Sequence, residues 1–213
     1  MIFSNDKEIA SILNILSETY PDTRCELNYD TPFQLLIATI LSAQATDKKV
    51  NEITAVLFSK YKTPEDLLKL KPEELELEIR QINFYKTKAK HILGICKELM
   101  NNYHGEVPVE REELVKLPGV GRKTANVVLS YAFNIPAIAV DTHVHRVANR
   151  IGMVTTNNAE KTELELEKRI PREYWSKTHS SIVLHGRRIC AARKPKCEIC
   201  KLIAYCNHFK KEQ

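Results

Sequence analysis

The chain has 213 residues, 43% of them hydrophobic and 28% charged, which is an ordinary composition for a globular protein with one large or two small domains. We find no basic segment followed by an apolar run at the N-terminus and no apolar stretch of about 18 residues, so we expect neither a signal peptide nor a membrane span. The formal net charge is +5, and residues 179–213 alone hold eight Lys/Arg against two Asp/Glu, so we expect the C-terminal end to bind a polyanion.

Apolar residues recur at helical spacing along nearly the whole chain, and no segment alternates with the period of a strand, which predicts an all-α fold. Ser4 or Asn5 is expected to cap a first helix, and a long helix is predicted over residues 87–103. Four later helix starts are predicted from a capping residue or from a proline in the first turn: Thr31-Pro32, Thr46-Asp47, Thr63-Pro64 and Lys71-Pro72.

The segment Leu117-Pro118-Gly119-Val120-Gly121 is predicted to join a short helical stretch, residues 112–117, to a longer amphipathic helix. Two glycines beside one valine allow a sharp turn that leaves amide groups uncovered at a helix N-terminus, which is a site for phosphate. Such contacts would ignore base sequence, because no side chain takes part. A tight turn that only packs is the alternative.

Lys123 lies in the first turn of that helix, about 150° from the centre of its apolar stripe, and so is predicted to point away from the core. The helix N-terminus and the neighbouring Arg122 both disfavour an ammonium there, which favours the free amine that Schiff-base chemistry needs. A solvated or phosphate-binding lysine is the alternative that the residues alone leave open.

Asp141 precedes a helix that carries Val144, Val147, Ala148 and Ile151, and is predicted to be its N-cap. A capping carboxylate stays ionised and oriented, and a fixed anion is what a developing oxocarbenium ion requires. His143 is a candidate phosphate contact, with a packed or solvated histidine as the alternative.

Four cysteines, Cys190, Cys197, Cys200 and Cys206, lie within 17 residues of this basic end. In a reducing compartment such a cluster favours metal ligation over disulfides, and the residues alone fit either zinc or an iron–sulfur cluster. The loop between the first two cysteines would hold Arg193, Lys194 and Lys196 as a fixed basic array.

Together these motifs resemble the endonuclease III family of bifunctional DNA glycosylases. The resemblance spans nearly the whole chain and rests on the four cysteines with their spacing and on four segments: residues 41–47, 117–126, 139–143 and 184–187. It implies a [4Fe-4S] cluster rather than zinc, with a structural role in docking DNA, and it adds Arg187 to the candidate DNA contacts.

By the same resemblance, Lys123 is the nucleophile that attacks the sugar of an extruded nucleotide, and Asp141 assists it and stabilises the sugar cation. Gln44 would fill the gap left by the extruded base. The implied substrates are double-stranded DNA with oxidised or ring-saturated pyrimidines and abasic sites, and β-elimination would cut the strand 3′ to the lesion.

One stretch departs from the family pattern. Many relatives carry Gly-Leu-Tyr-Asn before a Lys-Ala pair, with the leucine wedged into the opposite strand, whereas this chain has Asn83-Phe84-Tyr85-Lys86. Phe84 falls at the wedge position and would still intercalate. The alternative is that Phe84 belongs to the core.

The resemblance further implies two helical domains with a cleft between them. Residues 25–135 would form a six-helix domain with the hairpin, and residues 1–24 would join residues 136–213 around the cluster. We expect a monomer in the cytoplasm of a bacterium or archaeon, at the nucleoid, with no membrane partner. Two alternatives stay open: a monofunctional mismatch glycosylase, and a non-catalytic DNA-binding module stabilised by zinc.

Overall fold

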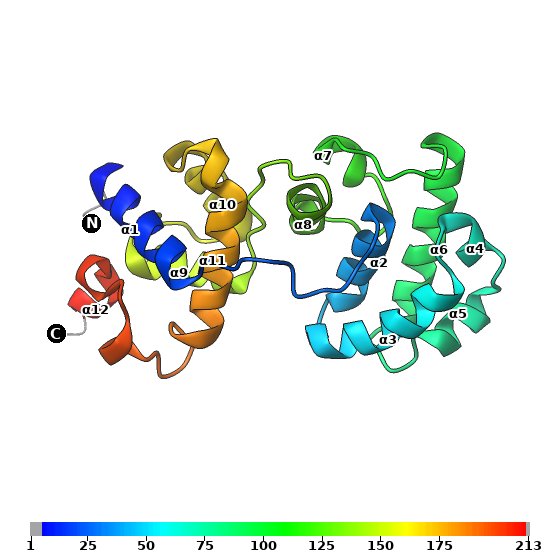
Figure 1. Ribbon diagram of the computed structural model, residues 1–213, viewed down its shortest axis with the longest axis horizontal. Coiled ribbons are helices and arrows are strands. Elements are labelled where there is room, and N and C mark those ends of the chain that lie inside the picture. The colour runs from blue at the N-terminus through cyan, green and yellow to red at the C-terminus, as the bar shows by residue number, and fades with distance from the viewer. Residues whose placement is uncertain (1–5, 212–213) are drawn as a thin grey trace. The chain divides into compact units, whose positions relative to one another are not determined.

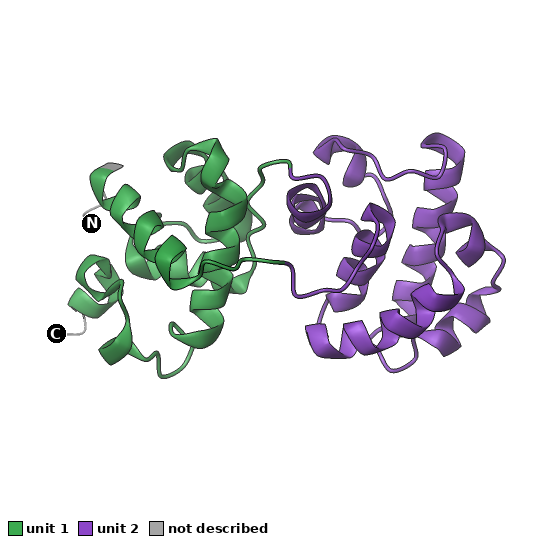
Figure 2. Ribbon diagram, in the orientation of Figure 1, with its two compact units in different colours: residues 1–24, 135–213 green, residues 25–134 purple. Residues whose placement is uncertain are grey.

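The computed structural model describes residues 6–211, and all regular structure in that range is helical (Figure 1). The all-α prediction is therefore confirmed. The predicted cap at Ser4 or Asn5 lies outside the described residues. The chain divides into two compact units, residues 25–134 and residues 1–24 with 135–213 (Figure 2). None of the helices in residues 6–211 has the length and apolar character needed to cross a membrane.

The unit of residues 25–134, all of them described, contains seven α-helices, whereas the family resemblance implies six. The shortest has four residues and lies where a short helical stretch is predicted before the hairpin. The seven are α2 (Pro32–Ser42), α3 (Asp47–Lys60), α4 (Pro64–Leu68), α5 (Pro72–Glu78), α6 (Tyr85–Asn102), α7 (Arg111–Leu114) and α8 (Arg122–Ala132).

The starts of α2, α3 and α4 follow from local chemistry, as predicted. Thr31 accepts a hydrogen bond from the Gln34 amide at the start of α2, and Thr46 accepts one from Lys49 at the start of α3. Thr63 forms a capping box with α4. Each bond satisfies an amide that the helix itself cannot pair, so the boundaries are set by single side chains.

Helix α2 is the centre of this unit. All residues from Phe33 to Leu41 are buried, so the helix has no solvent face. It packs against α3, α6 and α8. A helix that is apolar on every side has to be covered by neighbours, which holds the hairpin helix α8 and the N-terminal end of α3 around one core.

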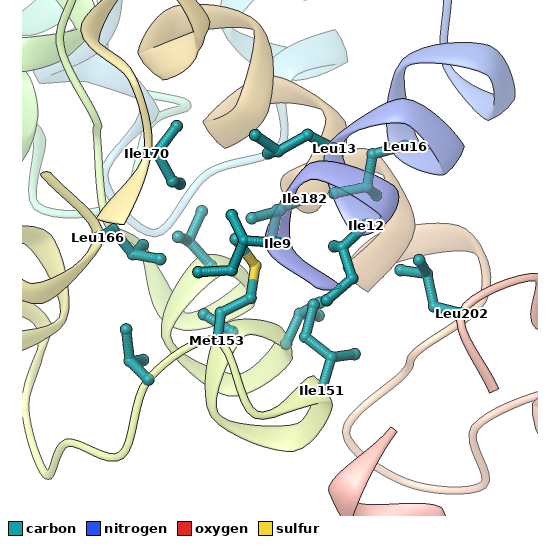
Figure 3. Packing of buried hydrophobic residues seen from close by; sticks show 14 of the residues in the cluster. Ile9, Ile12, Leu13, Leu16, Ile151, Met153, Leu166, Ile170, Ile182 and Leu202 are labelled. Atoms are coloured by element: carbon teal, nitrogen blue, oxygen red, sulfur yellow. The ribbon is translucent and has the colours of Figure 1, made fainter. Parts of the chain in front are cut away.

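The other unit joins the chain's first helix to its C-terminal half. It contains α1 (Asp6–Thr19), α9 (Thr142–Ile151), α10 (Ala159–Arg169), α11 (Trp175–Arg188) and α12 (Asn207–Lys211), with 3-10 turns at Arg172–Tyr174, Cys197–Ile199 and Ile203–Tyr205. Ile9, Ile12, Leu13 and Leu16 of α1 pack into its core (Figure 3).

Helices α9 and α11 approach closely at Gly186. A Cβ there would lie 2.9 Å from the Cβ of His143, nearer than side-chain atoms normally come. The glycine therefore permits the contact that sets α11, and the cysteines that follow it, against α9.

Candidate active site and nucleic-acid interface

The hairpin between α7 and α8 is a tight turn with glycine where the backbone requires it. The amide of Val120 donates to the carbonyl of Leu117 at 3.1 Å, and Gly119 between them has a φ of +76°. Pro118 and Gly119 thus occupy the second and third positions of the turn, the usual places for proline and for a residue with positive φ. The hairpin predicted from the sequence is confirmed.

The hairpin offers fewer amides than the sequence indicates. The Val120 side chain is only 6% exposed, and its amide is already used inside the turn, so Val120 supports the loop rather than facing a ligand. Gly121 is the N-cap of α8, and no side chain caps this helix. The amides of the first turn of α8 are therefore oriented for an acceptor outside the chain.

Lys123 is exposed in this same first turn. Ala125, Val128 and Leu129 of α8 are buried, which confirms the predicted core face. The lysine thus stands on the open side of the helix, beside amides that attract an anion. Both features suit the predicted phosphate site and the predicted nucleophile.

Asp141 is the N-cap of α9, as predicted. Its Oδ1 accepts hydrogen bonds from the amides of His143 at 2.8 Å and Val144 at 2.9 Å, and the residue is half-buried. Both bonds go to one oxygen, which leaves Oδ2 outside the cap. Lys123 and Asp141 belong to different compact units.

Helix α9 connects Asp141 to the cysteine region. His143 is half-buried, and its Nδ1 lies 3.2 Å from Nη2 of Arg146, so that ring nitrogen accepts. Arg146 also donates to the carbonyls of Gly186 and Cys190. His143 is therefore part of a network that fixes the cysteine region, in addition to being a candidate DNA contact.

The basic loop, residues 191–196, is anchored by a second arginine of α9. Arg150 donates to the carbonyl of Ala191 at 2.7 Å and to that of Ala192 at 3.0 Å. The amide of Lys196 donates a hydrogen bond to the carbonyl of Ile189. Sequence reasoning missed Arg146 and Arg150, because nothing in their spacing shows that they reach the backbone about 40 residues later.

The predicted cations project from this anchored loop. Arg193, Lys194 and Lys196 are all exposed, and Arg187 is exposed near the end of α11. Lys194 has a φ of +51°, which marks the bend of the loop. Fixed cations on an ordered loop can bind successive phosphates with little loss of conformational entropy.

None of the four predicted ligand cysteines, all within the described residues, forms a disulfide, and three of them lie at the edge of one core. Cys190 and Cys206 are 9% exposed and belong to the apolar cluster of their unit, and Cys200 packs against it. Burial raises the pKa of Cys200, and nearby Cys206, Cys190 and Cys197 raise it further. Within residues 6–211, no three His, Cys, Asp or Glu side chains converge closely enough to bind a single ion.

His185 supports this region and was not singled out by sequence reasoning. It is 3% exposed, with Nδ1 3.0 Å from the Tyr20 hydroxyl and Nε2 3.6 Å from the sulfur of Cys200. Burial lowers the pKa of His185 to about 4, so the ring is neutral near pH 7. Cysteine sulfur is the usual ligand of iron–sulfur clusters and of zinc, so the residue types suit either, although the described side chains do not converge on one ion.

Gln44 and Phe84 are exposed on loops of the other unit. Gln44 follows the end of α2 with a φ of +56°, and Phe84 precedes α6 with a φ of +58°. Phe84 is 62% exposed, so the alternative that it belongs to the core is wrong. A large apolar side chain held out in solvent is what a wedge between bases requires.

Comparison with known proteins identifies the relatives of this chain. Residues 37–172 match the HhH-GPD superfamily of base excision DNA repair proteins. Endonuclease III of Bacillus subtilis (strain 168) is 47% identical over 208 residues, which cover 97% of this chain and 95% of the relative. Endonuclease III of Escherichia coli (strain K12) is 45% identical over 207 residues, covering 97% and 98%.

Solved structures show the same similarity. A trapped endonuclease III–DNA covalent intermediate aligns with a TM-score of 0.94 at 47% identity, over 99% of both chains. A non-covalent endonuclease III–DNA complex aligns with a TM-score of 0.93 at the same identity. A thermostable thymine-DNA glycosylase aligns at 0.87 with 29% identity, over 97% of this chain and 98% of the other.

Proposed function

Because this chain belongs to the HhH-GPD superfamily of base excision DNA repair proteins, and within it to the endonuclease III family, we propose that it removes damaged pyrimidines from DNA through Lys123. The chain is a base excision repair enzyme, a DNA glycosylase and abasic-site lyase. This excludes the alternative of a non-catalytic DNA-binding module. The lesion, the residue roles and the cofactor are parts of the proposal.

The observation that carries the proposal is the position of Lys123, exposed in the first turn of the uncapped helix α8. The damaged nucleotide leaves the stack, because a nucleophile cannot reach C1′ within the duplex. The lysine amine attacks C1′, the C1′–N bond to the base breaks, and the base leaves with the bonding electrons and takes up a proton. Loss of the amine proton and ring opening give an imine between the lysine and the sugar.

The strand break follows from the imine. Loss of a proton from C2′ pushes electrons towards C3′, the C3′–O bond breaks, and the 3′ phosphate leaves. Asp141 supplies the negative charge that stabilises the sugar cation during base loss. Its cap on α9 supports this role, because two amide bonds to Oδ1 hold the carboxylate in a fixed orientation.

DNA docking uses backbone amides and fixed cations. Gly119 and Gly121 give the hairpin its shape, and the first amides of α8 bind a phosphate. His143, Arg187, Arg193, Lys194 and Lys196 would bind further phosphates. Gln44 and Phe84 would enter the duplex at the lesion, where Gln44 fills the gap and Phe84 separates the opposite base from its neighbour.

For the cofactor we propose a [4Fe-4S] cluster held by Cys190, Cys197, Cys200 and Cys206. Each of the four cysteines would supply one thiolate to one iron of the cluster, so they need not meet at a single ion. The cluster would hold the basic loop and the chain after it in shape, and the bond-breaking residues lie elsewhere. We place the enzyme in the cytoplasm of a bacterium or archaeon, acting as a monomer on the nucleoid.

The proposal is tested on duplexes that each carry one lesion, namely thymine glycol, an abasic site, or a thymine mispaired with guanine. We expect base release from thymine glycol followed by strand cleavage, and cleavage of the abasic duplex. Release of thymine from the mispair without strand cleavage would instead support a monofunctional mismatch glycosylase. Absence of release from any oxidised pyrimidine would refute the proposed lesion class.

A further inference from the structure

The turn that carries Gln44 is held by a hydrogen bond of its own and by two side chains, Asn83 and Lys88. The amide of Ala45 donates to the carbonyl of Ser42 at 3.0 Å, which closes a turn with Ala43 and Gln44 in its middle. Ala43 has φ −58° and ψ 115°, and Gln44 has φ +56°. This is the geometry of a type II turn, whose third position favours glycine. Gln44 is therefore kept in an unfavourable conformation by its surroundings.

Two further side chains, Asn83 just before α6 and Lys88 in the first turns of α6, donate to this segment. Nζ of Lys88 donates to the carbonyls of Leu41 at 2.8 Å and Ala43 at 2.6 Å. Nδ2 of Asn83 donates to the carbonyl of Gln44 at 3.0 Å. With the Ala45 bond, every carbonyl from residue 41 to residue 44 has a donor, and all four bonds come from within the turn or from Asn83 and Lys88.

Lys88 is suited to this place although it is only 5% exposed. Its ammonium lies at the C-terminal end of α2, where the helix dipole favours a cation, and its two recorded bonds go to carbonyls at that end. Separately, burial lowers the pKa of Lys88. The bonds of this buried lysine go to backbone oxygens, so its role is to hold the loop in position rather than to form an ion pair.

Asn83 adds a bond that a glycine cannot make. It directly precedes Phe84, so one residue both shapes the Phe84 loop and ties it to the Gln44 turn. Gln44 and Phe84 are both exposed, and both have positive φ. If the two side chains enter one duplex together, a tie between their loops fixes their spacing before DNA arrives and lowers the entropy lost on binding.

We propose that Asn83 and Lys88 are positioning residues that hold the Gln44 turn and the Phe84 loop as one preformed unit for entering DNA at the lesion. This inference rests on the proposed function for the target, DNA with an extruded nucleotide. It assigns no chemical step to either residue. Their effect is on the arrangement of the two loops before and during binding.

The test uses binding without chemistry. Wild type and Asn83→Ala are titrated with a duplex that contains a tetrahydrofuran abasic analogue, and with the single strand that carries the same analogue. Loss of one hydrogen bond predicts about two- to tenfold weaker binding to the duplex. Binding to the single strand should not change, because it has no opposite strand to enter. Asn83→Asp, which replaces the donor by an acceptor, should show at least as large an effect.

The matched control is Asn101→Asp, an exposed asparagine near the other end of α6, which should bind both DNAs as wild type does. The same two DNA titrations are made with Lys88→Met. Its melting temperature is also measured, because a buried lysine contributes to stability. Equal duplex binding by Asn83→Ala and wild type would overturn the inference, as would an equal loss on duplex and single strand. A failure of the proposed function appears separately, as absence of base release by the wild type.

Discussion

Asp141 shows how one side chain can serve both folding and catalysis. As the N-cap of α9 it accepts two amide bonds through Oδ1. Asparagine caps helices about as well as aspartate but carries no charge. The substitution Asp141→Asn therefore separates the structural contribution of this residue from its electrostatic contribution.

For Asp141→Asn we expect a melting temperature close to that of the wild type and a base-release rate lower by about 100-fold or more, the usual cost of removing a charge-stabilising group. Single-turnover release of thymine glycol measures the rate, and calorimetry measures stability. A near-normal rate would reduce Asp141 to a helix cap.

Lys88 gives a prediction that depends on pH. Burial lowers its pKa from the ordinary value of 10.5. Between the lowered pKa and 10.5 the unfolded chain binds this proton more tightly than the folded chain, so the contribution of Lys88 to stability rises with pH in that window. We therefore expect the free energy of unfolding of the wild type to increase relative to that of Lys88→Met as the pH rises from 8 towards 10.5. Urea unfolding at several pH values measures the difference, and a constant difference would contradict the burial.

Among the elements, the hairpin between α7 and α8 depends on one glycine far more than on the other. A Cβ at Gly119 would lie 2.4 Å from Nδ1 of His91 in α6, and the residue has a φ of +76°. A Cβ at Gly121 would meet nothing within 4 Å, and its φ is −95°. Glycine is therefore required at position 119, by the positive φ and the close approach of His91, and neither reason applies at position 121.

We expect Gly119→Ala to lower the free energy of unfolding by about 1–3 kcal/mol and to weaken DNA binding, since both strain and a clash are introduced. Gly121→Ala is the matched control and should unfold within about 0.5 kcal/mol of the wild type. Urea denaturation compares the two. Equal stability of both variants would contradict the described turn.

Elements with local determinants are the ones that the sequence predicts well. The starts of α2, α3 and α4 depend on Thr31, Thr46 and Thr63, each bonded to an amide three residues later. The anchoring of the basic loop is different, because Arg146 reaches the carbonyl of Cys190 across 44 residues of sequence. Composition and periodicity do not predict such a long-range hydrogen bond, so it is seen only in the folded chain.

The same distinction applies to the candidate site. The residue types of Lys123 and Asp141 and their places at helix N-termini can be inferred from sequence. Other contacts cannot be inferred in this way, because they depend on which backbone groups the fold brings together. They include the hydrogen bond of the Val120 amide and the bonds of Asn83 and Lys88 to the Gln44 turn. Phe84 is intermediate, since the sequence gives its position and the structure decides its exposure.

At the scale of the whole molecule, the cysteines tie the end of the chain to a core that begins with α1. Cys190 and Cys206 share the apolar cluster with Ile12 and Leu16. A bound cluster would therefore stabilise the unit of residues 1–24 and 135–213, while the unit of residues 25–134 has its own core around α2.

We expect Cys200→Ser to lose iron and sulfide, to bind DNA more weakly, and to show faster amide exchange in residues 190–206 and α12, with α2 and α6 still protected. Cys25→Ser, a half-buried cysteine of the other unit, is the control and should keep its iron. Exchange followed by mass spectrometry measures both. Full iron content in Cys200→Ser would contradict its assignment as a ligand.

The most direct measurement of the central claim is borohydride trapping on a duplex with thymine glycol, followed by mass spectrometry of the adduct. The imine mechanism predicts one covalent protein–DNA product, with the sugar attached to Nζ of Lys123. The adduct should be absent in Lys123→Gln and present in Lys116→Gln, an exposed lysine on the other side of the hairpin. A trapped adduct that persists in Lys123→Gln, or base release by the wild type without any adduct, would contradict the assignment of Lys123.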